Sequence, residues 1–236
     1  MLVFLPQFRI RLGEIGLYVV SFNFLQDLVG AADLLVFDVE HRVDKVLALE
    51  PEIVLPSHGL PIIGRDLVVK RLTKYRDAIQ YVHDEVVKGM NAGKDVFTLM
   101  QEIKLPPKFE LSESFGKVSW SVRGIYDGYA GWFDTNPTTM YELPSASVYP
   151  DLVKLAGGPE PLVRLAREKI EASKPVEALH LTDVVLAYDQ RNGGALNVRI
   201  KALEQLQKNC ENFVEEGWLE YGIAKAKKQL VSGDSK

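Results

Sequence analysis

The residues from 53 to 64 constrain the fold most, because the hydrophobic pattern of the chain changes across them. Ile53-Val54-Leu55 is an apolar run that Pro56 stops, as in a short buried strand. Before this point the apolar residues alternate in places with a period of two, and beyond Gly64 they follow the helical period. We therefore predict a mainly α protein, with an all-helical region at 65–230 preceded by a short α/β region at 1–64.

The pattern before Gly64 predicts a few strands and one helix. Two short strands, at 2–5 and 8–12, are expected around a turn, and residues 33–49 have helical spacing that ends at Glu50-Pro51. Three short strands and one helix cannot cover both faces of a sheet. Residues 1–64 are therefore expected to be the end of a larger α/β domain.

Beyond Gly64 the spacing predicts a series of helices. A strong amphipathic helix is expected at 65–91, a short one at 95–103, and one or two at 149–173. Residues 175–230 resemble a tetratricopeptide-type helical hairpin. Arrays of that type need about three repeats to stand alone, so we expect this hairpin to pack on its neighbours. Residues 231–236 are predicted to be a flexible tail.

An aromatic stretch within 115–133 is the second informative segment. Trp120, Arg123, Tyr126 and Tyr129 are three or four residues apart, so we predict that they share a broad face of one helix, with Trp132 just beyond it. Arginine and aromatic residues are enriched at protein interfaces. The alternative is that this face forms part of a large internal core.

Composition excludes several classes of protein. The net charge of −4, from 28 basic and 32 acidic residues, does not favour nucleic-acid binding or an anionic membrane surface. The single cysteine excludes an intrachain disulfide framework. Because no apolar run reaches about 18 residues and no signal-peptide pattern is present, we expect a cytoplasmic protein without a membrane span.

Three residues are candidates for chemistry. His58 follows the predicted strand, where imidazole could bind zinc or merely cap a turn. Glu14, between glycines at a predicted strand end, is either a metal ligand or a solvated loop acid. His83, followed by Asp84 within the amphipathic helix, is expected to make structural hydrogen bonds, with catalysis as the alternative.

A set of short motifs over about residues 2–230 resembles the C-terminal portion of alkyl sulfatase-like proteins of the metallo-β-lactamase superfamily. The matching residues are Leu49-Glu50-Pro51-Glu52, Pro56-Ser57-His58-Gly59-x-Pro61, Gly64, Arg76-Asp77, Tyr81-x-His83-Asp84, Asn91-x-Gly93, Leu105-Pro106, Arg123-x-x-Tyr126, Gly131-Trp132-Phe133-Asp134-x-Asn136-Pro137 and Gly157-Gly158. The combination is specific, although no single motif would be.

This resemblance implies a dinuclear zinc hydrolase domain followed by an all-helical dimerisation domain. It implies cleavage of alkyl sulfate esters by a metal-activated water. His58 matches the last zinc-binding histidine of the family, and Glu14 matches its metal-bridging carboxylate. The resemblance also implies a homodimer, and the helices of the 65–137 region are the expected interface.

The departures from the family pattern bear on activity. The His-x-His-x-Asp-His cluster is missing, and no two of the four histidines are two residues apart. Val29 stands where the family has an arginine, and Trp120 where many members have histidine. A two-metal site needs more ligands than Glu14 and His58 can supply.

Three functional hypotheses follow. The first is a dimerisation scaffold of a zinc-dependent sulfatase-like hydrolase, inactive alone and without stably bound zinc. The second is a sulfuric ester hydrolase that completes its zinc site with ligands from upstream sequence or a partner chain. The third is a tetratricopeptide-type peptide binder, which the absence of a second predicted hairpin opposes.

Overall fold

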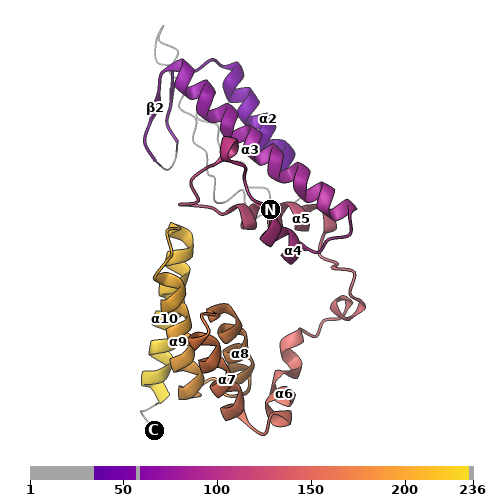
Figure 1. The fold of residues 1–236 in the computed structure, drawn as a ribbon, viewed down its shortest axis with the longest axis vertical. Helices are drawn as coiled ribbons and strands as arrows, with labels where there is room; N and C mark the ends of the chain where they lie inside the picture. The colour runs from indigo at the N-terminus through magenta and orange to yellow at the C-terminus, as the bar shows by residue number, and fades with distance from the viewer. Residues whose placement is uncertain (1–34, 57–58, 234–236) are drawn as a thin grey trace. The chain divides into compact units, whose positions relative to one another are not determined.

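The computed structural model describes residues 35–56 and 59–233 (Figure 1). Residue contacts divide the chain into two compact units, one ending at Asp134 and the other beginning at Thr135. The predicted strands at 2–5 and 8–12, together with Glu14, Val29 and His58, lie outside the described residues. Each unit is described by itself below.

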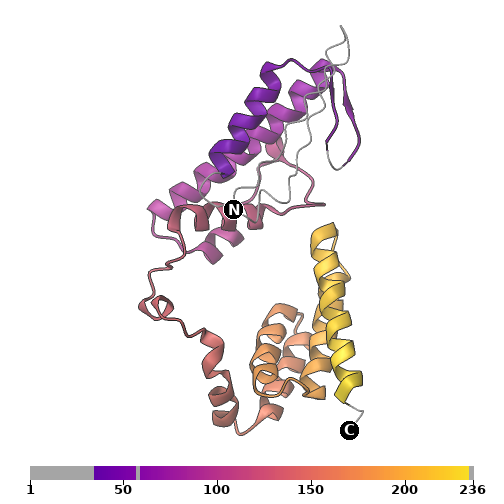
Figure 2. The ribbon, with the colours of Figure 1, turned by 180° about the vertical axis from the view of Figure 1, so that it is seen from behind.

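In the first unit, helix α2 (Leu35–Ala48) lies along helix α3 (Arg65–Asn91), as both ribbon views show (Figures 1 and 2). Val43 and Val46 of α2 are buried, and Arg76 of α3 donates a hydrogen bond to Asp44 of α2 at 2.7 Å. The compact units therefore divide at 134/135, whereas the boundary predicted from periodicity lies at 64/65. The physical reason is that α2 and α3 bury their apolar faces against each other.

The segment between α2 and α3 is a small β-hairpin. Strand β1 (Ile53–Val54) pairs antiparallel with β2 (Ile62–Ile63), and Ile53 lies opposite Ile63. The prediction that residues 1–64 form the end of a larger α/β domain also involves residues outside the described part of the chain. Among the described residues β1 pairs only with β2, because the intervening turn, which includes Gly59 at φ +95°, reverses the chain locally.

Two further helices complete the first unit. Helix α4 (Val96–Glu102) begins at Asp95, whose carboxylate accepts hydrogen bonds from the amides of Phe97 and Thr98. A short 3₁₀ turn, η1 (Pro107–Phe109), leads toward α5 (Val118–Ala130). Helix α5 ends at Gly131, which has a φ of +68° that glycine adopts without strain.

The second unit consists of two 3₁₀ turns followed by five helices. These are η2 (Pro137–Met140), η3 (Ser145–Val148), α6 (Tyr149–Leu155), α7 (Pro159–Glu171), α8 (Pro175–Tyr188), α9 (Gly193–Gln207) and α10 (Phe213–Gly233). Two helices therefore occupy the 149–173 region, because Gly157 and Gly158, both with positive φ, separate α6 from α7. Residues 231–233, predicted to belong to a flexible tail, continue α10, and 234–236 lie outside the described residues.

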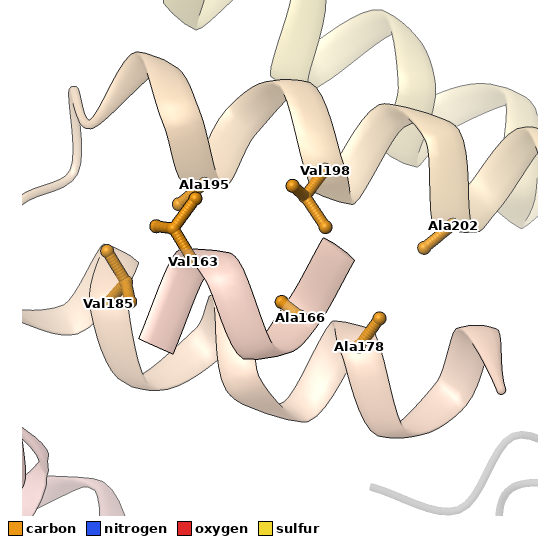
Figure 3. Close-up of a cluster of buried hydrophobic side chains, with 7 residues drawn as sticks. All are labelled: Val163, Ala166, Ala178, Val185, Ala195, Val198 and Ala202. Atoms are coloured by element: carbon orange, nitrogen blue, oxygen red, sulfur yellow. The ribbon is translucent and has the colours of Figure 1, made fainter. Parts of the chain in front are cut away.

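Helices α7 to α10 pack in sequence, each against the next. Small and β-branched side chains from three of them meet in one buried cluster (Figure 3): Val163 and Ala166 of α7, Ala178 and Val185 of α8, and Ala195, Val198 and Ala202 of α9. The hairpin predicted at 175–230 is thus α8 to α10, and α7 packs on it as well. Helix α8 has apolar side chains on more than one side, so more than one neighbouring helix is needed to bury them.

The prediction of a mainly α protein is confirmed. Between residues 66 and 230 the structure contains helices, 3₁₀ turns and loops and no strand, and β1 and β2 both precede residue 64. None of the helices in the described part of the chain combines the length and apolarity required to cross a membrane.

Candidate functional site

The aromatic stretch on α5 is held in place by a core shared by three helices. Val82 and Val86 of α3, Leu99 of α4, Ile103 just after α4, and Val122 and Ile125 of α5 form one buried cluster. Gly89 makes the contact between α3 and α4 possible, since a Cβ at this position would lie 2.3 Å from Cδ2 of Leu99. The core fixes which side of α5 faces inward.

The structure divides the residues that we predicted to share one face of α5. Tyr126 packs against the buried cluster, whereas Arg123 is exposed and binds Asp127 at 3.1 Å. The guanidinium carbon of Arg123 lies 5.5 Å from the ring centroid of Phe97 on α4. Trp120 is half-buried, with the Lys117 ammonium 5.6 Å from its ring centroid. The spacing of these residues did not reveal which of them face the core and which face outward. A helix turns 100° per residue, so side chains up to nine residues apart spread over a wide arc of its surface.

Tyr129, near the end of α5, joins a buried histidine of α3. The hydroxyl of Tyr129 lies 2.7 Å from Nε2 of His83, and Nδ1 of His83 lies 3.0 Å from Oδ1 of Asp84. Gln80, one turn earlier, donates to the same carboxylate oxygen at 2.9 Å. His83 is only 9% exposed, so these bonds satisfy a polar ring inside the unit. The expected structural hydrogen-bonding role of His83 agrees with this arrangement, but nothing in the sequence identified Tyr129 as its partner.

The chemistry of Asp84 assigns the protons in this network. The hydrogen bond from His83 lowers the pKa of Asp84 below 3.8, and the bond from Gln80 acts in the same direction. An ionised carboxylate only accepts, so Nδ1 of His83 donates to it, and in the neutral ring Nε2 accepts a hydrogen bond from the hydroxyl of Tyr129. Since the pKa of Asp84 is lowered by folding, its stabilising contribution is present above pH 3.8 and is lost as the pH falls through the folded-state pKa.

Replacing Tyr129 with phenylalanine removes the bond between α5 and α3 without changing the ring. We expect the free energy of unfolding to fall by about 0.5–1.5 kcal/mol, the net worth of a typical hydrogen bond. Urea unfolding at neutral pH measures the change. Tyr141→Phe is the matched control, because Tyr141 is 72% exposed. Equal stability of the Tyr129→Phe variant and the wild type would contradict a stabilising role for this bond.

Beyond this junction several large apolar side chains of the first unit are exposed. Trp132 is 77% exposed and Phe97 61%, and Tyr129 and Phe115 are partly exposed. The ring of Trp132 lies beside that of Phe133, with centroids 5.7 Å apart. Exposed aromatic side chains such as these are candidates for protein–protein contacts, because aromatic residues are enriched at interfaces.

The predicted zinc site cannot be assembled from the described part of the chain. Glu14 and His58, its two predicted ligands, both lie outside the described residues. Within 35–56 and 59–233, no group of three or more histidine, cysteine or acidic side chains could hold a metal ion. The described residues do not by themselves fit a dinuclear centre.

Comparisons with known proteins agree with the resemblance drawn from the motifs. A sequence profile of the alkyl sulfatase dimerisation family matches residues 97–228, which extend from α4 into α10. A linear primary-alkylsulfatase of Pseudomonas sp. is 31% identical over 181 residues, which are 75% of this chain and 34% of that protein. The alkyl/aryl-sulfatase BDS1 of Saccharomyces cerevisiae is 24% identical over 164 residues, covering 68% of this chain and 25% of that protein.

A solved structure shows the same fold. The stereoselective inverting sec-alkylsulfatase Pisa1 of Pseudomonas sp. superimposes with a TM-score of 0.74 at 20% identity, over 93% of this chain and 36% of that one. The matches thus span between a quarter and about a third of the length of these relatives. Because the family profile covers more than half of its residues, this chain belongs to the alkyl sulfatase dimerisation family.

Proposed function

We propose that this chain is the dimerisation portion of an alkyl sulfatase-like hydrolase and forms a homodimer through the helices of the 65–137 region. The observation that carries the proposal is the match of residues 97–228 to a dimerisation family. The exposed aromatic side chains of α4 and of the end of α5 support it, because aromatic residues are enriched at protein interfaces. A two-fold interface is the commonest way to cover them.

The predicted interface residues take different parts in this proposal. Trp132, Tyr129 and Arg123 are exposed and available to a second copy. Trp120 is half-buried and contributes its outer edge, whereas Tyr126 supports the interface from the core side. Trp132 is the expected anchor, since exposed tryptophans that become buried on association dominate interface energetics. Obligate interfaces of this kind bury about 2,000 Å² or more.

Light scattering coupled to size exclusion tests the dimer. We expect a mass of twice 26.5 kDa at micromolar concentration. Trp132→Glu should weaken the dimer by about tenfold or more, because it places a charge at the expected anchor. Trp218→Glu is the control, since Trp218 is 69% exposed but lies on α10, outside the proposed interface. A mass that stays at 26.5 kDa as concentration rises would refute the proposal, and equal weakening by both variants would refute its location.

We further propose that the chain alone does not hydrolyse alkyl sulfates and that zinc belongs to the intact proteins of this family. The missing His-x-His-x-Asp-His cluster supports this proposal, because a metal-activated water needs about three protein ligands on its metal. The alternative is a sulfuric ester hydrolase whose zinc site is completed by ligands from elsewhere. The names of the relatives, which are alkylsulfatases, favour this alternative for the longer proteins.

An activity assay distinguishes the inactive chain from the sulfuric ester hydrolase. We expect no turnover of a linear alkyl sulfate or a β-lactam by the purified chain, with or without added zinc. Zinc-dependent turnover that disappears in the His58→Ala variant would contradict the first proposal and support the second. The His180→Ala variant is the control, because His180 lies on α8, in the other compact unit.

A further inference from the structure

Helix α10 is the outermost helix of the second unit, and α9 lies between it and the helices α7 and α8 (Figures 1 and 2). Its inner face is buried, because Leu219, Ile223 and Ala226 join side chains of α9 in one core cluster. Gly222 lets the two helices approach closely, since a Cβ at this position would lie 3.0 Å from Cδ1 of Leu203. These contacts fix which side of α10 faces outward.

The outer face of α10 carries an exposed stripe that is largely apolar. Its residues, which we call the α10 stripe, recur every three or four positions: Phe213, Gly217, Tyr221, Ala224, Lys228 and Val231. This spacing places them along one side of the helix, as in helices that pack lengthwise against another helix. Stacks of helical hairpins normally end in a helix with a polar outer face. The stripe is therefore typical of a helix surface that another helix covers.

Gly217 leaves open space within the stripe. A Cβ at this position would meet no atom of the described chain within 4 Å, so packing inside the unit does not call for glycine there. A glycine inside a helix costs about 1 kcal/mol relative to alanine. Because glycine lets a second backbone come close, an approaching helix would use this space.

The charges along the stripe identify the covering helix as a second copy of α10. Glu220 lies four residues before Ala224, and Lys228 lies four residues after it. Both are exposed, and neither makes an ion pair with another side chain in the described part of the chain. A two-fold axis at Ala224 would place Lys228 of an antiparallel second copy opposite Glu220, and its Val231 opposite Gly217. A parallel copy would instead bring like charges together, which is unfavourable.

We propose that two copies of this chain associate through antiparallel packing of the α10 stripe, as a second contact besides the interface of the 65–137 region. Ala224 lies on the two-fold axis, where the backbones come closest, and Tyr221 and Val231 bury apolar surface on either side of it. One helix face is smaller than the standard interface of about 1,600 Å², so the contact is weak, with an expected Kd of about 10⁻⁴ M. It therefore adds to the assembly only at high concentration, wherever the first interface lies.

Charge exchange tests this contact by sedimentation equilibrium of the full chain, up to about 10⁻³ M. We expect the mass to double over this range. Glu220→Lys should raise the Kd of that step at least about tenfold, because like charges then face each other across the axis. The exchanged variant Glu220→Lys/Lys228→Glu should regain the original Kd. The control Glu168→Lys makes the same change in net charge at an exposed position of α7 and should leave the Kd unchanged. No doubling, no recovery in the exchanged variant, or an equal loss in the control would overturn the proposal.

Disulfide trapping reads the α10 contact independently of the other interface. In a Cys210→Ser background, Ala224→Cys should form an interchain disulfide on mild oxidation, because residue 224 lies beside its own copy at the axis. Ala187→Cys is the matched control, since Ala187 is an exposed alanine on α8. Adding Glu220→Lys should slow the cross-linking at 224, even if the first interface lies elsewhere than we propose. Cross-linking at both positions at the same rate would contradict the α10 contact.

Discussion

Replacing Leu99 with alanine should lower the free energy of unfolding of the first unit by about 2–5 kcal/mol. Leu99 is 2% exposed and belongs to the cluster that α3, α4 and α5 share. Removing its side chain leaves a cavity between the three helices. The surrounding structure relaxes only partly, so the cavity does not close fully. This contact also keeps α5, and therefore Tyr129 and the exposed tryptophan beyond it, in position.

Urea unfolding followed by tryptophan fluorescence measures this effect in the correct unit. Of the three tryptophans, Trp120 and Trp132 lie in the first unit and Trp218 in the second, so a Trp218→Phe background reports on the first unit. Leu60→Ala is the matched control, because Leu60 is 84% exposed in the same unit and should cost little. A loss of less than about 1 kcal/mol for Leu99→Ala would contradict the described core.

Enlarging Ala178 should destabilise the second unit by about 1–3 kcal/mol. Ala178 is fully buried on α8, where small side chains let α7 and α9 approach (Figure 3). Leucine has nearly the same helix propensity as alanine, so an Ala178→Leu variant changes packing and little else. The added methyl groups would force α8 away from its neighbours.

Ala187→Leu provides the control on the same helix, because Ala187 is exposed. Both variants are compared in a Trp120→Phe/Trp132→Phe background, in which Trp218 on α10 reports on the second unit. We expect Ala187→Leu to remain within about 0.5 kcal/mol of its parent. If the two variants behave alike, the close approach of α7, α8 and α9 is not a determinant of stability.

The tertiary structure decided most of the candidate site. The sequence indicated that His83 would make hydrogen bonds, but Tyr129 is 46 residues away and its pairing depends on how α5 crosses α3. The same crossing turned Tyr126 toward the core and left Arg123 outside, although their spacing suggested one shared face. None of these contacts is encoded in local periodicity.

The sequence by itself determined the helices and their ends. Gly93, Gly131 and the pair Gly157-Gly158 adopt positive φ where the chain must leave a helix, and such signals act over a few residues. The family likewise followed from short motifs. The partners of each helix followed only from folding: α2 joined α3 across the predicted boundary, and α7 joined the hairpin of α8 to α10. The hydrophobic effect has no direction, so an apolar helix face can be buried by any apolar surface that covers it. Which surface covers it depends on the fold of the whole chain, whereas a helix cap depends on a few neighbouring residues.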